Sequence, residues 1–447
     1  MRYRIVVLIA ATSLLVELRP VVAQTQDDRN TCFVDTNKSF DARVHACTNI
    51  INSKQATKQL IASALDTRAG LYADKNDYLR ATEDFALSLK LDSRAGTYFQ
   101  RGNMYWMKGI HDKANADEYQ AIADFTQAIR LTPITPDCFG LDSNPTTRTQ
   151  ACVSAITTVY AAYHNRSHVY AGINDFNHAI ADYTIEIESH PEFYLPRRSR
   201  AGAFLDIGDY DRAIDDFNES LQLYPKDDEA YLGRANAFLQ KGTFDRAIDD
   251  FSAGLKLAEN GPNHVPTYNA KFYLGRAKAY QLKKDFTSAL ADYENTLQLD
   301  PQPQTYVVRG ALLLQTGNTD RAIADYNEAI RLDSSYALAW NNRCWAEVLK
   351  DQLALALKDC NESLRLKPDN EATLDSRALV YLKIGNLEAA ISDYDAALKV
   401  NPKFASSLYG RGLVKNKKEN GTGNADIAAA LALSPDITKD YAGYGIK

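Results

Sequence analysis

Apolar and small residues recur along this chain in pairs of short stripes, each spaced as on one face of an α-helix. In the segment 226–258 the first stripe is Tyr231, Arg234, Ala235 and Phe238, and the second is Phe244, Ala247, Ile248, Phe251 and Leu255. Gly242 interrupts the pattern between them, which predicts two antiparallel helices joined by a tight turn. Two short helices cannot bury both of their faces alone, so each hairpin needs neighbours.

The same hairpin recurs with a fixed period. Ala213 and Ala247 begin second helices and stand 34 residues apart, and the same interval separates Ala322, Ala356 and Ala390. Unrelated amphipathic helices would not recur at a fixed interval of 34 residues. A fixed period of this length predicts an all-α solenoid of antiparallel helix hairpins.

The hairpin resembles the tetratricopeptide repeat (TPR), in which small residues, aromatic residues and a closing proline recur at set positions. We count positions so that the alanine of the second helix is position 20. The alanines are Ala81, Ala121, Ala179, Ala213, Ala247, Ala289, Ala322, Ala356 and Ala390, and the closing prolines are Pro191, Pro225, Pro301, Pro368 and Pro402. The resemblance implies a right-handed superhelical TPR array whose first helices line a concave surface that holds peptides or partner helices.

Each hairpin carries an arginine at position 7 and an aspartate at position 23, such as Arg200 with Asp216, Arg234 with Asp250, and Arg377 with Asp393. Both positions lie at similar distances from the turn. Each arginine is therefore predicted to meet an aspartate, in its own hairpin or in the adjacent one, through two parallel hydrogen bonds. An arginine-lined groove for anions is the functional alternative. Matched opposite charges in every hairpin favour structural ion pairs.

The first residues have the pattern of a targeting segment. Arg2 and Arg4 precede a mostly apolar stretch over 5–16, and small residues end at Ala23. We expect a signal peptide over 1–23 with cleavage before Gln24, with an uncleaved anchor as the alternative. The apolar stretch is too short for a stable membrane span. An exported protein is predicted, in the periplasm or secreted.

The six cysteines fall into three near pairs, Cys32/Cys47, Cys138/Cys152 and Cys344/Cys360. Export permits disulfides, so the three pairs are disulfide candidates, and whether all three are oxidised is left open. Cys344 and Cys360 occupy positions 8 and 24, which face each other across the hairpin. Glu347 replaces an aromatic residue in that hairpin, so a cross-link there would compensate for a weakened interior.

The predicted organisation follows the repeats. Residues 24–56 form a cap that ends in a lone second helix, and 57–435 hold about nine full hairpins and one degenerate copy. Insertions are expected near 107–120, 133–152 and 258–266, and residues 436–447 form a C-terminal tail. Loops of this kind often build binding surfaces, so the 133–152 insertion is either a specific binding element or a spacer.

No catalytic set, phosphate loop or cofactor motif is present in the sequence, and neither an enzyme nor a cofactor is predicted. His164 and His168 share one helix face at the spacing of metal ligands, with His178 on the partner helix. No further ligand is obviously placed beside them. We interpret the first two as solvated groove histidines and predict no metal site.

Positions 5 and 9 of the first helices are expected to face the groove. The candidate binding residues are His164, His168, Arg198, Asn236, Lys278, Asn341, Trp345 and Asp375. This mixture of apolar, amide and charged groups suits an extended polypeptide. The net charge of −6 and the lack of a basic run argue against nucleic acid. The predicted function is a non-catalytic exported scaffold for a protein or peptide. The alternative is an envelope protein associated with carbohydrate or peptidoglycan.

Overall fold

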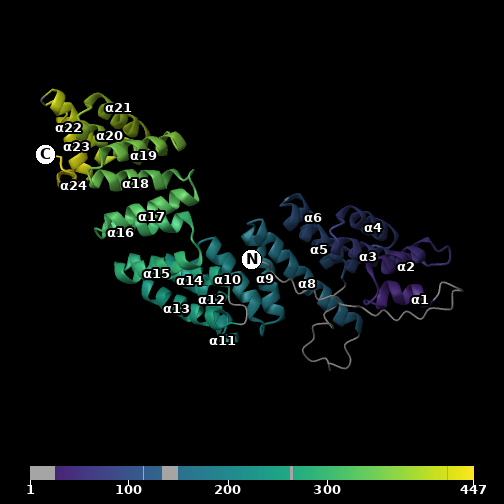
Figure 1. The fold of residues 1–447 in the computed structure, drawn as a ribbon. Coiled ribbons are helices and arrows are strands. Elements are labelled where there is room, and N and C mark those ends of the chain that lie inside the picture. The colour runs from purple at the N-terminus through teal and green to yellow at the C-terminus, as the bar shows by residue number, and fades with distance from the viewer. Residues whose placement is uncertain (1–25, 114, 133–149, 262–264, 420, 447) are drawn as a thin grey trace. The chain divides into compact units, whose positions relative to one another are not determined.

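The computed structural model describes residues 26–113, 115–132, 150–261, 265–419 and 421–446. These residues form helices joined by short turns, and the described part of the chain contains no β-strand. The predicted all-α array of hairpins is confirmed (Figure 1). The chain divides into two compact halves, Met1–Pro225 and Lys226–Lys447.

The N-terminal half begins with two short helical turns and a cap helix, which are α1 (Gln26–Arg29), η1 (Asn30–Val34) and α2 (Phe40–Asn52). Four hairpins follow, each made of a first and a second helix. They are α3 (Lys58–Asp74) with α4 (Tyr78–Leu91), α5 (Ala95–Asp112) with α6 (Asn115–Leu131), α8 (Gln150–Gly172) with α9 (Phe176–Ser189), and α10 (Tyr194–Asp206) with α11 (Tyr210–Leu223). The cap helix packs on α3, the first helix of the first hairpin.

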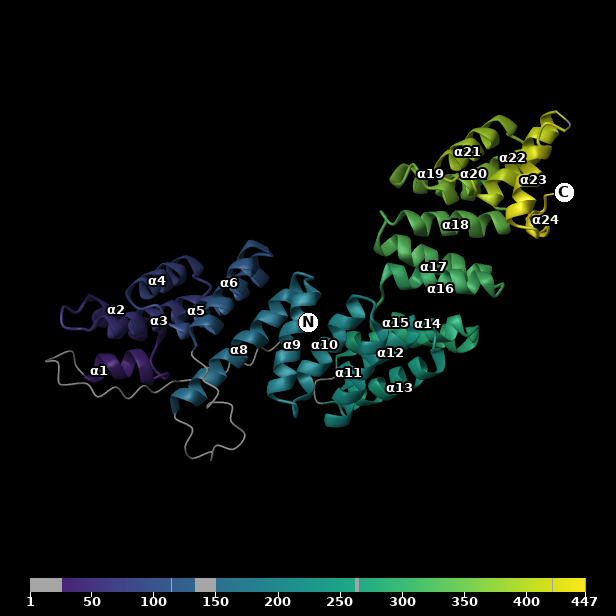
Figure 2. The ribbon, with the colours of Figure 1, turned by 180° about the vertical axis from the view of Figure 1, so that it is seen from behind.

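The C-terminal half holds six hairpins and a final short helix. The hairpins are α12 (Asp228–Gln240) with α13 (Phe244–Asn260), α14 (Pro266–Leu282) with α15 (Phe286–Leu299), α16 (Pro303–Gln315) with α17 (Thr319–Leu332), α18 (Ala337–Leu349) with α19 (Leu353–Leu366), α20 (Glu371–Ile384) with α21 (Leu387–Val400), and α22 (Ala405–Lys418) with α23 (Asn424–Leu433). The final helix is α24 (Ile437–Gly443). Figure 2 shows the same succession from behind.

Small residues let the two helices of a hairpin approach closely. The alanine at position 20 is fully buried in every hairpin that has one, for example Ala247 and Ala322. In the hairpin of α16 and α17, a Cβ atom added to Gly310 would lie 2.6 Å from the ring of Tyr326, which is 1% exposed. The small residue on the first helix therefore makes room for the aromatic side chain of the second helix.

The turns of the hairpins follow the chemistry of their sequence. Gly242 and Gly385 have φ of +75° and +83°, in the left-handed region that favours glycine. After the second of these turns, the Asn386 side chain accepts a hydrogen bond from the backbone N–H of Ala389 and caps α21. The predicted break at Gly242 is thus a helix end and turn.

Helix packing within each half distinguishes an inner layer from an outer one. First helices of most successive hairpins contact each other, as α3 does with α5 and as α18 does with α20. Among the described residues, the second helices of successive hairpins do not contact each other to this extent. Such an array curves locally with its first helices on the inner side, which is the side predicted to bind.

The predicted signal peptide and the 133–149 part of the predicted insertion lie outside the described residues. The extra residues near 107–120 lengthen α5 and α6, and those near 258 lengthen α13 to Asn260. Sequence expectation placed loops there. None of the described helices has the length and apolar character needed to cross a membrane.

Candidate binding surface

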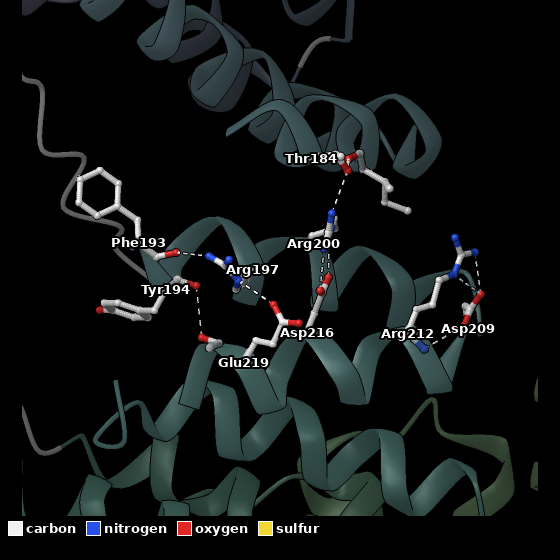
Figure 3. A network of polar contacts seen from close by, with 11 residues as sticks. Thr184, Phe193, Tyr194, Arg197, Arg200, Asp209, Arg212, Asp216 and Glu219 are labelled. Carbon is white, nitrogen blue, oxygen red and sulfur yellow. Dashed lines mark hydrogen bonds and ion pairs between the residues drawn. The ribbon is translucent and has the colours of Figure 1, made fainter. Parts of the chain in front are cut away.

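An arginine–aspartate pair joins the two helices of each hairpin. Arg200 on α10 donates from Nε and Nη2 to the two carboxylate oxygens of Asp216 on α11, at 2.7 and 2.8 Å (Figure 3). Only 19% and 8% of these side chains are exposed. The bond to Asp216 raises the pKa of Arg200 above its ordinary value, so the guanidinium stays charged.

All ten arginines bond in this way to the aspartate of their own hairpin, which resolves the open choice between own and adjacent hairpin. The other pairs are Arg68–Asp84, Arg101–Asp124, Arg166–Asp182, Arg234–Asp250, Arg276–Asp292, Arg309–Asp325, Arg343–Asp359, Arg377–Asp393 and Arg411–Asp426. These carboxylates are engaged inside the hairpins, and so are the guanidinium groups. The arginines hold the frame together and do not line an anion groove.

Most of these arginines also use their third guanidinium nitrogen, Nη1. It donates a hydrogen bond to the second helix that comes just before the arginine's own hairpin. Nη1 of Arg200 donates to Thr184 Oγ1 on α9 at 3.0 Å (Figure 3). The acceptor stands at position 25 of the preceding hairpin. Equivalent bonds are Arg68–Thr48, Arg166–Thr126, Arg276–Ser252, Arg309–Glu294, Arg343–Asn327, Arg377–Asn361 and Arg411–Asp395. Each of these arginines therefore joins three helices.

Two of the predicted disulfides are present. Cys32 and Cys47 are bonded with their Cα atoms 5.0 Å apart, and Cys344 and Cys360 with theirs 5.5 Å apart. The Cys138–Cys152 pairing lies outside the described side chains. Beside the second bond, Glu347 is buried, and burial together with the charge of nearby Asp359 raises its pKa to about 7. The cross-link thus lies where the hairpin has a carboxyl group in place of an aromatic ring.

His164 and His168 on α8 lie together, as their spacing predicts, with ring centroids 4.7 Å apart. Nδ1 of His164 is 2.9 Å from Oε2 of Glu186 on α9, a side chain that is fully buried. Ser167 donates to the other oxygen of Glu186 at 3.0 Å. The sequence suggested no carboxylate beside these histidines, and the structure supplies one.

His168 is not the solvated groove histidine that was expected. Its ring is partly buried and stacks on Trp106 at 6.3 Å between centroids. Burial, with a smaller effect from the neighbouring His164 and Arg198, lowers the pKa of His168 to about 3. The ring is therefore neutral near pH 7 and forms part of the inner wall. His178, also considered with this pair, bonds instead to Asp175.

The other predicted groove residues differ in how open they are. Arg198 on α10 is partly buried, with its guanidinium 6.0 Å from the ring centroid of Tyr194. In the C-terminal half, Asn236 on α12 is partly buried and Lys278 on α14 is exposed. Lys278 is therefore the most accessible of the candidate positions in that half.

The last three candidates are covered by the chain itself. Asn341 is only 8% exposed, and Trp345 packs against Tyr444 with ring centroids 4.9 Å apart. Asp375 is 7% exposed and accepts hydrogen bonds from the hydroxyls of Ser406 and Ser407 at 2.7 and 2.6 Å. The expectation of an open groove side chain is thus wrong for Asp375, because the next first helix closes over it.

Two sets of residues escaped the sequence interpretation, although a closer comparison of the hairpins contains the signal. Position 25 holds a hydrogen-bonding side chain in most hairpins, and those side chains receive the third arginine bond. Position 27 is small in the other hairpins, as at Ser220 and Ala329, but is Glu186 in one. In the described residues, no three metal-binding side chains come together.

Models of known protein families match the repeated hairpins of this chain. A family model of the tetratricopeptide repeat matches residues 165–228 and 198–265, a second model of it matches 270–303, and a TPR repeat model matches 310–343 and 378–418. None of the curated proteins matches the chain.

Several solved structures resemble this chain at low identity. The APC/C hetero-tetramer Cut9–Hcn1 has 15% identity over 92% of this chain and 85% of that chain, with a TM-score of 0.43. The C-terminal part of a TPR repeat-containing protein from Cytophaga hutchinsonii has 18% identity over 54% and 97%, with a TM-score of 0.43. YrrB, described as a TPR protein with an unusual peptide-binding site, has 18% identity over 44% and 97%, with a TM-score of 0.37.

Similarity this low says nothing about what this chain binds. The matched repeats and the observed hairpins, with small, aromatic and charged residues at the predicted positions, nevertheless agree along both halves. The chain is a tetratricopeptide repeat protein.

Proposed function

We propose that this protein is an exported, non-catalytic scaffold that binds a protein or peptide partner along the inner faces of its first helices. One observation carries the proposal. Positions 7, 20 and 23 repeat the same chemistry and hold the hairpins together, whereas positions 5 and 9 differ from one first helix to the next. Residues that vary while the frame repeats are the ones free to serve recognition.

The inner positions offer complementary contacts to a polypeptide. Lys278 is exposed on α14 and can pair with an acidic side chain, while the amide of Asn236 on α12 can bond to a peptide backbone. In the N-terminal half, His164 and Arg198 add polar groups next to aromatic rings. This surface differs from an enzyme pocket because its groups are spread over successive helices.

Two observations support export. The Cys32–Cys47 and Cys344–Cys360 disulfides are typical of an oxidising compartment, and the N-terminal residues have the composition of a signal peptide. We propose a periplasmic or secreted location. Mass spectrometry of the mature chain tests the expected cleavage before Gln24, and a retained apolar segment would favour the uncleaved anchor instead.

Affinity capture from an envelope extract tests the binding surface. Lys278→Glu reverses an exposed charge on a first helix and should weaken capture of the partner. Lys256→Glu makes the same change at an exposed position of α13, a second helix, and is the matched control. Equal capture by both variants would show that the inner face is not the binding surface. Circular dichroism checks that both variants keep their helices.

The identity of the captured material separates the two functional classes. A recovered protein supports the scaffold. Retention on peptidoglycan or exopolysaccharide, with no protein recovered, would replace the proposal with the carbohydrate alternative.

A further inference from the structure

The C-terminal segment of the chain lies against the inner layer of first helices. In both ribbon views α24 is beside the ends of α18 and α20 (Figures 1 and 2). Tyr444 meets Trp345 of α18 edge to face, and Tyr441 meets Tyr409 of α22 in the same way, with centroids 4.9 and 4.8 Å apart. Trp345 is one of the positions expected to bind a partner, so the chain occupies part of its own inner face.

Tyr441 is the deep anchor of this segment. Its side chain is 2% exposed, and its hydroxyl donates to the backbone carbonyl of Ser406 on α22 at 2.9 Å. A Cβ atom added to Gly410 would lie 2.3 Å from the hydroxyl of Tyr394 and 2.5 Å from that of Tyr441, so a glycine on α22 makes room for both. The inner face therefore contains a notch, lined by Gly410 and Tyr394, that holds the hydroxyl end of Tyr441.

Lys383 on α20 recognises the main chain of the segment. Its Nζ donates to the backbone carbonyl oxygen of Tyr444 at 3.0 Å and also lies 2.9 Å from Asp351. A bond from a groove side chain to a backbone carbonyl holds a peptide regardless of its side chain at that point. The aromatic contacts of Tyr441 and Tyr444 then supply the selectivity.

The surface under α24 is partly polar. Asp375 lies beneath it, bonded to the hydroxyls of Ser406 and Ser407, and Lys383 lines its edge. The same surface is also apolar, because Ile437 and Tyr441 join a buried cluster with Leu379 and Val414. The floor under α24 therefore offers both polar and apolar contacts to a peptide.

The segment itself is short. Helix α24 has seven residues, fewer than an isolated helix needs to be stable in water. Its position therefore depends on the anchoring side chains, with Ile437 and Tyr441 buried and Tyr444 only half-buried. Loss of the shallower anchor should loosen the segment while α18, α20 and α22 stay folded.

We propose that the inner face of α18, α20 and α22 is a binding site for a peptide segment with two tyrosines three residues apart, and that residues 436–446 occupy it as a resident competitor. A partner peptide of this chemistry displaces α24, places one tyrosine in the Gly410 notch and the other against Trp345, and takes the backbone bond from Lys383. The proposal rests on the scaffold function above and specifies its partner.

The test uses the full-length protein and a fluorescein-labelled synthetic peptide of residues 436–447. Fluorescence anisotropy should show weak binding to the wild type, because the site is occupied in cis. Tyr444→Ala in the protein should lower the apparent Kd about tenfold, since the apparent affinity scales with the open fraction. Lys439→Ala alters an exposed tail residue and is the matched control, with no change expected. A peptide with both tyrosines replaced by alanine should not bind.

Two further measurements make the result decisive. Adding Lys383→Met to the Tyr444→Ala protein should weaken peptide binding again. In the wild type, the amides of α24 should exchange with deuterium faster than those of α20 and α22. Equal exchange rates, or equal peptide affinity of wild type and Tyr444→Ala, would show that α24 is a fixed cap. A wild-type dimer that the peptide dissociates would place the tail in a second copy and overturn binding in cis.

The outcomes separate this inference from the proposed function. If affinity capture recovers a protein partner but the labelled peptide binds neither protein, only the tyrosine site is refuted. If the peptide binds as described but no partner is captured, the scaffold function loses its support while the site remains.

Discussion

Replacing Arg200 by methionine would leave a buried carboxylate without its partner. Asp216 accepts two hydrogen bonds from Arg200, and the two side chains are 8% and 19% exposed. Removing one member of a buried ion pair costs about 3–5 kcal/mol. Because Arg200 keeps some contact with water, we expect a loss near the lower end, about 3 kcal/mol.

The double variant Arg200→Met/Asp216→Leu should recover most of this loss. It removes both charges and fills the space with apolar groups, which is often nearly neutral. The remaining cost is the bond to Thr184, about 1 kcal/mol. The double variant is therefore expected to be about 2 kcal/mol more stable than Arg200→Met alone, a non-additivity typical of side chains in contact.

Hydrogen exchange of the α10 and α11 amides is the appropriate assay, because repeat arrays open locally. The control is Arg212→Met on α11, which breaks a surface pair with Asp209 whose side chains are 62% and 31% exposed. That change should cost less than about 1 kcal/mol. If the double variant is as unstable as Arg200→Met, the pair does not act as a buried ion pair and the reasoning fails.

Three further predictions concern single features. Replacing Cys344 and Cys360 by alanine should cost about 3 kcal/mol by the loop-entropy model, seen as faster exchange in α18 and α19; unchanged exchange would contradict it. The pKa of His168 is about 3, below that of an unfolded histidine, so the unfolded chain binds more protons and stability falls as the pH drops below about 6.5. His168→Phe should reduce the loss of unfolding free energy between pH 7 and pH 5 by about 1–2 kcal/mol, as measured by urea titrations at both pH values. An equal loss in wild type and variant would refute this. Asn386→Ala removes the cap of α21 and should cost about 1 kcal/mol, with a cost near zero counting against the cap.

Sequence periodicity was enough to predict the hairpins because the same spacing of small and apolar residues repeats many times along the chain. The interval between Ala213 and Ala247 determines where each second helix begins, and the structure places α11 and α13 there. Arginine and aspartate could be matched for the same reason. The choice between own and adjacent hairpin needed coordinates, since positions 7 and 23 are compatible with either.

The candidate site was less predictable because it depends on how one hairpin approaches the next. Asp375 was expected in an open groove, but Ser406 and Ser407 of the following first helix bond to it. Trp345 faces the inner side, where Tyr444 covers it from far along the sequence. A repeat pattern describes what all hairpins share, and these contacts occur in one place only.

Because most of the arginines join three helices, they affect how such a chain can gain or lose residues in evolution. Most hairpins supply an arginine that bonds to the preceding second helix and an acceptor at position 25 for the arginine of the following hairpin, as Thr184 does for Arg200. Excising or duplicating one whole hairpin would create a junction with matching donors and acceptors. A cut inside a hairpin would instead separate Arg200 from Asp216. Evolution by insertion and deletion is therefore expected to proceed in whole repeats.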